Sequence, residues 1–293
     1  MTSATGPCPG CGSEAAPRPL LTKGTWLYAT CPDCALVHLD PVPSPDESAA
    51  LYGESYFTGG GVGEYIDYAA DDDLHRINAR SHIARLARTR KGPPGRLLDF
   101  GCAYGFVADE LRAAGWDVEG VEISEIAAQH ARDRFGLTVY PDFEKAIAAN
   151  GEGAFDVITF FQVLSQLPSS AAALDSAHAL LRPGGMVMVE SSNRGGTIAR
   201  ALGRHWHLIA PPSVISLFEP ETLDGLLRRR GFEPVARFPT RKAVSVGLVA
   251  NVLEQRYGRV FSPLRSLGAK PAVRGRAIRY PFADLMTVVA TRR

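Results

Sequence analysis

Short apolar runs and longer stretches of helical spacing alternate along most of this chain. Runs of this kind are typical of buried strands, and helical segments between them favour a parallel sheet covered on both faces. The fold class predicted from this pattern is therefore α/β. Strands are expected near residues 97–100, 117–122, 138–140, 155–161, 185–190, 232–238 and 284–291.

One more helix is predicted ahead of the first strand, between Asp71 and Arg90. Three aspartates begin this segment and arginines end it, and both match the charge preference of a helix dipole. Its apolar side chains recur at helical spacing, which predicts the face that packs against the rest of the protein. That face is expected to hold Leu74, Ile77, Ile83 and Leu86.

The first strand of the alternating region ends in an acid and a glycine turn. The turn reads Asp-x-Gly-x-x-x-Gly from Asp99, and a second apolar run ends in Glu122, about twenty residues after Gly101. This is the arrangement of a βαβ nucleotide-binding half, whose second acid binds ribose hydroxyls. It is not the dinucleotide fingerprint, because Ala103 and Phe106 stand where glycines are needed, and no Lys-Ser pair follows to make a P-loop.

The turn resembles motif I of the class I S-adenosylmethionine (SAM) methyltransferases. Residues 155–164 are similar to that family's fourth strand, 180–190 to its Leu-x-Pro-Gly-Gly turn and fifth strand, and 218–232 to its late helix. The resemblance covers roughly residues 97–238 plus the last strand. It implies a seven-stranded, doubly wound, Rossmann-like sheet with the last strand antiparallel, and SAM across the carboxyl ends of the first strands.

The resemblance also implies a set of cofactor-binding residues. Glu122 would bind the two ribose hydroxyls, Asp142 and Phe143 would lie near the adenine, and Gln162 near the sulfonium. The alternative for Gln162 is a polar loop residue, and for Cys102 a small packing residue beside the turn. The full predicted set is Asp99, Gly101, Cys102, Gly105, Phe106, Glu122, Ile123, Asp142, Phe143, Phe161, Gln162 and Tyr65.

The positions that often carry a general base in similar enzymes are not basic here. Ser165 and Gln166 follow the fourth strand, and Gln166 is predicted to orient an acceptor by hydrogen bonding. His205 and His207 are candidate bases, since neutral histidine accepts a proton at physiological pH. The alternative is that both histidines are ordinary polar residues beside Trp206.

A glycine-rich segment with tyrosines precedes the predicted helix. Tyr56 and Tyr65 are expected to contact the methionine end of the cofactor or the acceptor, as part of a mobile cover over the site. The alternative is that these tyrosines pack the N-terminal extension onto the core.

Four of the five cysteines lie before residue 35, in two Cys-x-x-Cys pairs separated by 19 residues. This spacing predicts a structural zinc site, because four thiolates fill a tetrahedral shell and leave no open position. Iron is the alternative metal, and unpaired surface cysteines are the alternative to any metal. The predicted ligands are Cys8, Cys11, Cys31 and Cys34.

Composition divides the chain into three parts. A zinc ribbon is expected at residues 1–40, a linker, cover and helix at 41–92, and the methyltransferase domain at 93–293, with insertions near 194–218 and 241–282. The second insertion holds nine Lys or Arg residues and one acid, which favours an anionic acceptor or else a solvated charged face.

The net charge of the chain, +1, argues against nucleic acid as the partner. No apolar run could span a membrane, and no signal-peptide pattern is present, so a cytoplasmic location is expected.

The sequence therefore predicts SAM-dependent methyl transfer to an oxygen, nitrogen or carbon atom of a small molecule, in specialised metabolism or in sugar or glycan modification. Three alternatives remain open. They are an RNA methyltransferase, an interaction module with a degenerate core, and a SAM-binding protein with other chemistry. The oligomeric state stays undetermined at this point.

Overall fold

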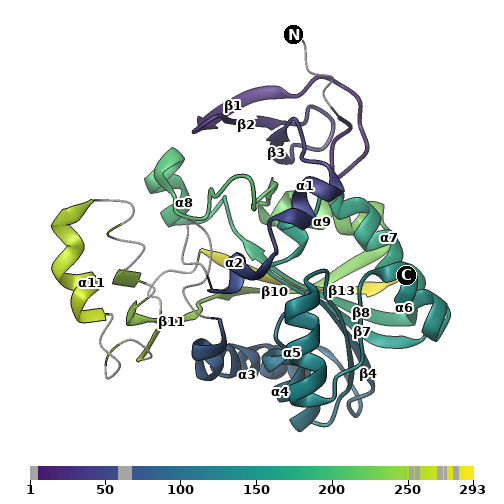
Figure 1. Ribbon diagram of the computed structural model, residues 1–293. Helices are drawn as coiled ribbons and strands as arrows, with labels where there is room; N and C mark the ends of the chain where they lie inside the picture. Colours follow the sequence, from purple (N-terminus) through teal and green to yellow (C-terminus); the bar gives the residue numbers. More distant parts are fainter. Residues whose placement is uncertain are drawn as a thin grey trace.

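The computed structural model describes residues 6–58, 68–247, 249–250, 254, 258–268, 273, 276–279 and 284–293. Two sheets dominate it. A seven-stranded sheet forms the body of the protein. Three of the strands of a smaller four-stranded sheet belong to the N-terminal part of the chain, which is coloured purple in Figure 1.

The central sheet confirms the predicted seven-stranded, doubly wound fold. Its order is β10-β13-β8-β7-β4-β5-β6, and β13 runs antiparallel to both of its neighbours while β8, β7, β4, β5 and β6 are parallel. The strands are β4 (Arg96–Phe100), β5 (Asp117–Val121), β6 (Val139–Tyr140), β7 (Phe155–Phe161), β8 (Leu181–Ser192), β10 (Phe232–Thr240) and β13 (Leu285–Arg292).

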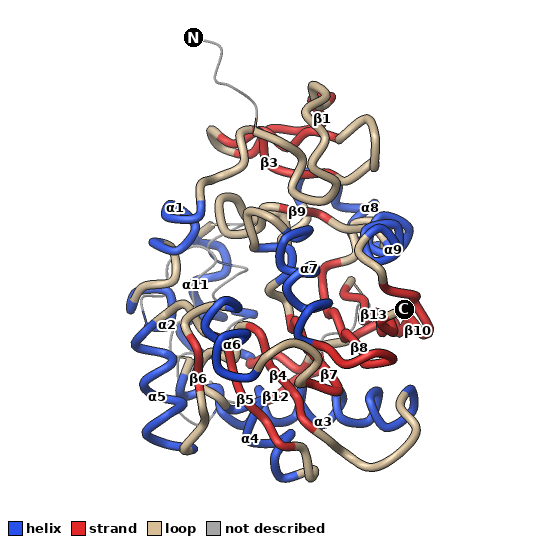
Figure 2. The backbone as a smooth tube through the Cα atoms, turned by 90° about the vertical axis from the view of Figure 1, so that its right-hand side faces the viewer, coloured by secondary structure: helices blue, strands red, loops and turns tan. Residues whose placement is uncertain are grey.

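Helices cover both faces of this sheet (Figures 1 and 2). Successive strand residues point to opposite faces, so Leu97 packs in one core cluster and Leu98 in the other. The Leu97 cluster includes residues of α3 (Asp72–Thr89), α4 (Phe106–Ala113) and α5 (Glu125–Phe135). The Leu98 cluster includes residues of α6 (Phe143–Asn150), α7 (Ser170–Leu180) and α9 (Pro220–Arg229).

The predicted N-terminal helix is present as α3, but its buried face differs from the expected one. Ile77 is 38% exposed, whereas His75, Ala79 and His82 are buried beside Leu74 and Leu86. The prediction for Ile77 was therefore wrong. The pattern of apolar residues could not show this, because imidazole rings count as polar although here they stack on aromatic neighbours.

Short elements connect the layers. A capping box between Ser44 and Glu47, with Pro45 in the first turn, begins α1 (Pro45–Ala50), and α2 (Glu54–Thr58) follows it. The remaining elements are η1 (Ala69–Asp71), η2 (Leu164–Gln166), α8 (Thr197–Leu202), η3 (Gly203–His205), β11 (Ala243–Ser245), η4 (Arg259–Phe261), α11 (Ser262–Gly268) and β12 (Ala277–Arg279).

The N-terminal sheet is completed by a strand from the first insertion. It consists of β1 (Arg18–Lys23), β2 (Trp26–Thr30), β3 (Val37–Asp40) and β9 (Ser216–Leu217), with β9 antiparallel to β3. Tyr28, Leu39 and Trp206 are buried in one cluster, so the ribbon and the insertion share a hydrophobic core. Within the described residues, no helix is both long and apolar enough to cross a membrane.

Candidate functional site

A cavity of about 660 Å³ opens at the carboxyl ends of β4, β5 and β7. In a doubly wound sheet this edge is where ligands bind. The α1–α2 segment, the first turns of α7 and one face of α3 form its other walls. The cavity therefore has a floor made by the glycine turn and a cover made by the N-terminal segment.

The predicted glycine turn after β4 is present, and its backbone is left-handed at both glycines. Gly101 has φ +77° and Gly105 φ +86°, a region that glycine enters freely. Ala103, between them, has φ +48° and is one of three non-glycine residues in the described chain with positive φ. A Cβ at Gly101 would also lie 2.4 Å from Cγ2 of Val163, so no side chain fits there.

Two buried carboxylates line this end of the cavity. The carboxylate of Glu122 accepts hydrogen bonds from the backbone amides of Ala103 and Ser124, both at 2.9 Å, which fixes its orientation. Asp99 accepts a 2.6 Å hydrogen bond from the hydroxyl of Thr159. Burial raises the pKa of Asp99 to about 6 and also raises the pKa of Glu122. We call this end the acidic half.

Most of the predicted cofactor residues line the cavity. Gly105 and Phe106 do not: Gly105 precedes α4, and Phe106 is 1% exposed in an aromatic cluster. Tyr65 lies outside the described residues. Those that do line it are Asp99, Gly101, Cys102, Glu122, Ile123, Asp142, Phe143, Phe161 and Gln162.

Three of these side chains also have clear packing or capping contacts. Cys102 is buried against Gly120, where an added Cβ would lie 2.5 Å from its sulfur, and burial raises the pKa of its thiol. Asp142 caps α6 by accepting a 2.7 Å hydrogen bond from the amide of Lys145. Phe143 stacks on Phe100 with ring centres 4.3 Å apart.

Aromatic residues of the N-terminal segment cover the cavity. Tyr56 lines it and also packs edge-on against Tyr52 and Phe57, and its contact with the cofactor or the acceptor stays a prediction. The hydroxyl of Tyr52 donates a 3.0 Å hydrogen bond to the side-chain oxygen of Gln166. Gln166 thus lines the cavity with its amide held in place.

The two histidines considered as bases lie elsewhere. His205 is exposed at the end of η3, and His207 lies 3.7 Å from the carboxylate of Asp284; neither is among the residues that line the cavity. Any role for them as bases stays a prediction.

The face of α3 brings two other histidines to the cavity, which sequence reasoning missed. His75 and His82 are buried, and both line it. They are seven residues apart, so two helical turns place them on one face, and this spacing is the signal that could have found them. Burial lowers the pKa of His82 to about 4 and that of His75 to about 3, so both rings are neutral at pH 7.

His82 belongs to a buried polar group at the end of β8. Its Nδ1 lies 3.6 Å from the carboxylate of Glu190, and its ring stacks on Phe161 with centres 4.0 Å apart. Gln162 donates a 3.0 Å hydrogen bond from its side chain to the same carboxylate, and its own backbone is left-handed at φ +61°. A non-glycine residue in that region is strained, and such strain gathers at functional sites.

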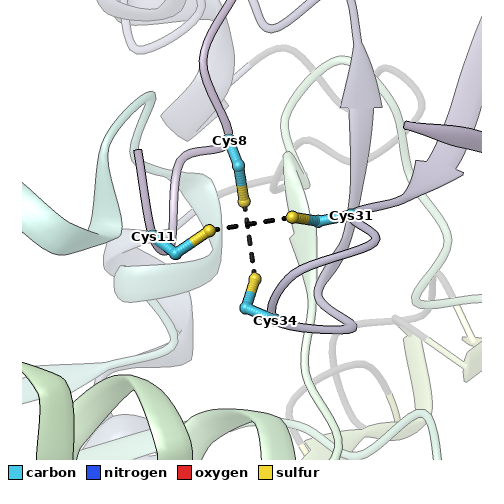
Figure 3. A group of neighbouring side chains, drawn as sticks. All are labelled: Cys8, Cys11, Cys31 and Cys34. Carbon is cyan, nitrogen blue, oxygen red and sulfur yellow. Dashed lines mark hydrogen bonds between the residues drawn. The ribbon is translucent and has the colours of Figure 1, made fainter. Parts of the chain in front are cut away.

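The four cysteines converge as their spacing predicts (Figure 3). Their sulfur atoms all lie within 4.8 Å of one another, with 3.6 Å between Cys8 and Cys34 and 3.7 Å between Cys11 and Cys31. Bonds of about 2.3 Å to zinc would give tetrahedral edges of about 3.8 Å. The donor set and its spacing therefore fit a tetrahedral metal ion.

The ribbon also contacts the wall of the cavity. The amide of Ala171 in α7 donates a 3.0 Å hydrogen bond to the carbonyl of Pro9, between two of the cysteines. The amide of Ile215 donates to the carbonyl of Ser165, and the amide of Leu39 in β3 donates to the carbonyl of Ile215, both at 2.9 Å. Ser165 directly precedes Gln166, so these hydrogen bonds link the ribbon to the segment that carries Gln166.

Comparison with known proteins agrees with this geometry. The family described as "Methyltransferase domain" matches residues 64–237, more than half of the chain. Two curated relatives are named ubiquinone biosynthesis O-methyltransferase. The protein from Ralstonia nicotianae is 29% identical over 173 residues, which is 55% of this chain and 72% of that protein. The protein from Aromatoleum aromaticum is 30% identical over 171 residues, 55% and 73% respectively.

Solved structures share the fold. A SAM-dependent methyltransferase from Thermotoga maritima has a TM-score of 0.52 and 19% identity, over 81% of this chain and 98% of that one. Another from Archaeoglobus fulgidus has a TM-score of 0.51 and 16% identity, over 77% and 99%.

Proposed function

The chain belongs to the methyltransferase-domain family and is a SAM-dependent methyltransferase, and from this premise we propose that it methylates a hydroxyl oxygen of a small molecule. The cavity is the observation that carries the proposal, because it joins a glycine turn and two buried carboxylates to a wall that bears neutral histidines. The names of the curated relatives support oxygen as the acceptor atom. Specialised metabolism or sugar modification stays a prediction.

The acidic half suits the adenosyl cosubstrate. Glu122 is held by two backbone amides, and a carboxylate has further lone pairs with which to accept from a pair of ribose hydroxyls. The backbone of Gly101 is free of side-chain bulk, which allows close approach. A ligand that carries a sulfonium would also offset the unpaired negative charge of Asp99 and Glu122.

When bound, the cosubstrate supplies an activated methyl group, so the protein mainly has to align two reactants. We propose that His82 accepts the proton that the hydroxyl releases. Its ring is neutral at pH 7 and lines the cavity, and its Nδ1 lies 3.4 Å from a guanidinium nitrogen of Arg85 and 3.6 Å from the carboxylate of Glu190. The proposal requires the tautomer with the hydrogen on Nδ1, toward Glu190, so that Nε2 accepts the proton. Gln162 and Gln166 would hold the hydroxyl by hydrogen bonds.

We also propose zinc as the metal of the ribbon, bound by Cys8, Cys11, Cys31 and Cys34. Support comes from the four sulfur donors and their tetrahedral spacing. Four protein ligands leave no open position, so the metal would hold the ribbon together and take no part in methyl transfer.

The test is methyl transfer by the purified full-length protein. Incubation with SAM and 3,4-dihydroxybenzoate should yield adenosylhomocysteine and a methyl ether, identified by mass spectrometry. The dimethoxy compound, whose oxygens are blocked, is the control for acceptor-independent cleavage. Methylation of 3,4-diaminobenzoate without any ether from the diol would contradict oxygen as the acceptor atom.

A further inference from the structure

The part of the cavity lining that bears His75 and His82 also carries an unpaired positive charge. Lys242 lies between β10 and β11, is half-buried, and lines the cavity. Within the part of the chain that the structure describes, it makes no ion pair, although most other half-buried cations do. A partly desolvated ammonium without a partner is costly, so this position suits a ligand that brings a negative charge.

The backbone beside Lys242 is held firmly in place. The side chain of Asn78 in α3 donates a 3.0 Å hydrogen bond to the carbonyl of Ala243 and accepts a 2.8 Å hydrogen bond from its amide. This paired contact fastens the start of β11 to the face of α3 that bears His75 and His82. The backbone next to Lys242 is therefore held in place against α3, as a binding site requires.

The nearby charges do not neutralise it. Glu190 already lies within 3.9 Å of Arg85 and 3.6 Å of His82, and accepts from Gln162. The charge of Lys242 reaches both histidines and lowers their pKa values. We call this wall, made by His75, His82, Glu190 and Lys242, the basic half, since Glu190 is paired with Arg85, which does not line the cavity, and Lys242 is left as the unpaired cation.

We infer that Lys242 binds an anionic group of the methyl acceptor, such as a carboxylate, while the acidic half holds the cationic cosubstrate. This inference rests on the proposed function and adds the chemical class of the acceptor to it. The two halves then sort two reactants of opposite charge within one cavity. Such a site also discriminates against neutral analogues of the acceptor, because a neutral group leaves the ammonium of Lys242 without a partner.

The experiment compares 3,4-dihydroxybenzoate with 3,4-dihydroxybenzamide, which has the same ring and hydroxyls but no charge. The unsubstituted protein should show a KM for the acid about 10- to 100-fold below that for the amide, the range expected for one hydrogen bond to a charged group. Lys242→Met should raise the KM for the acid to that for the amide and leave the amide unchanged. Lys242→Arg, which keeps the charge, should restore most of the preference.

Arg241→Met is the matched control, because this neighbouring cation is exposed and does not line the cavity. It should leave the preference for the acid intact. Calorimetry with 3,4-dihydroxybenzoate in the presence of adenosylhomocysteine gives the same comparison without turnover, and Lys242→Met should lose the binding that Arg241→Met retains.

The outcomes separate this inference from the proposed function. Equal KM values for acid and amide in the unsubstituted protein would overturn the inference and leave the methyl transfer standing. Weaker SAM binding by Lys242→Met would assign the lysine to the carboxylate of the cosubstrate, and this result would also overturn the inference. Methylation of neither compound would overturn both proposals together.

Discussion

The amide of Ala171 donates a hydrogen bond to the carbonyl of Pro9, which joins the first cysteine turn of the ribbon to helix α7. Ser169 and Ala172, on either side of this bond, line the cavity. The ribbon thus supports the wall that carries Gln166, whereas the glycine turn and Glu122 are built by β4 and β5. Loss of the metal should therefore disturb the wall that carries Gln166 more than the end formed by the glycine turn and Glu122.

Replacement of Cys34 by serine tests this. We expect metal content, measured by mass spectrometry, to fall from about one ion per chain to near zero, and proteolysis to cut within the ribbon. The KM for the acceptor should rise, while SAM affinity should change little. Cys102→Ser, which alters the cysteine outside the cluster, should keep the metal. Full metal content in Cys34→Ser would contradict the four-cysteine site.

Glu122→Gln should weaken SAM binding. The substitution keeps the size of the side chain but removes the charge and replaces one acceptor oxygen by a donor. Hydrogen bonds to charged groups contribute about 1.5–3 kcal/mol each, so Kd should rise at least about 10-fold in calorimetry. Glu125→Gln alters an exposed carboxylate nearby and should leave Kd unchanged. An unaltered Kd in Glu122→Gln would remove this residue from the cosubstrate site.

The carboxyl of Asp99 predicts how stability depends on pH. Its pKa rises from 3.8 unfolded to about 6 in the folded protein, so between those values the folded state keeps a proton that the unfolded state releases. Stability therefore falls as the pH rises through this window, by about 3 kcal/mol. Asp99→Asn keeps an acceptor for Thr159 and should raise the free energy of unfolding above about pH 6.

Urea unfolding of the SAM-free protein, followed across this range of pH, measures that effect. The gain of Asp99→Asn over the unsubstituted protein should shrink toward zero below about pH 4, where both states carry the proton. A gain of equal size at both extremes would show that the carboxyl does not titrate as its burial requires.

His82→Gln should lower kcat. General base catalysis by a positioned side chain contributes about 100- to 10,000-fold, and we expect the lower end because the sulfonium is already activated. A diol that is ionised at neutral pH, 4-nitrocatechol, needs no base and should lose much less. His178→Gln, a histidine on α7 outside the cavity, is the matched control. An equal loss with both diols would assign His82 a packing role.

Gly101→Ala should destabilise the protein in two separable ways. The left-handed backbone at φ +77° costs an alanine about 1–2 kcal/mol, and its Cβ would overlap Val163. Combining it with Val163→Ala removes the overlap, so the double variant should recover only part of the loss in free energy of unfolding. Full recovery would mean that the backbone at residue 101 relaxes without cost.

Much of the central sheet could be predicted because its determinants are local. A glycine turn, an apolar run and an acid lie within a few residues of one another, so β4 and Glu122 are visible in the sequence. The pairing of β9 with β3 was not, since Ser216–Leu217 is too short to carry a pattern and its partner is far away in the chain.

Lys242 of the basic half belongs to the basic insertion at 241–282 that the sequence analysis singled out, but the histidines and the carboxylate beside it escaped prediction for a different reason. His75 and His82 interrupt the apolar stripe of α3, and Glu190 ends the apolar run of β8, so each reads as a polar residue at the edge of an element. Their burial depends on stacking partners from other segments, Tyr68 and Phe161. Such long-range compensation has no local sequence pattern.

The late strand of the N-terminal sheet has a consequence for synthesis of the protein. The ribosome releases β1, β2 and β3 long before β9, so the nascent ribbon has an unpaired edge at β3 until Leu217 emerges. An exposed edge is open to pairing with other chains. Early capture of the proposed zinc ion by the four thiolates would keep this segment compact during translation, and the yield of folded enzyme would then depend on zinc supply.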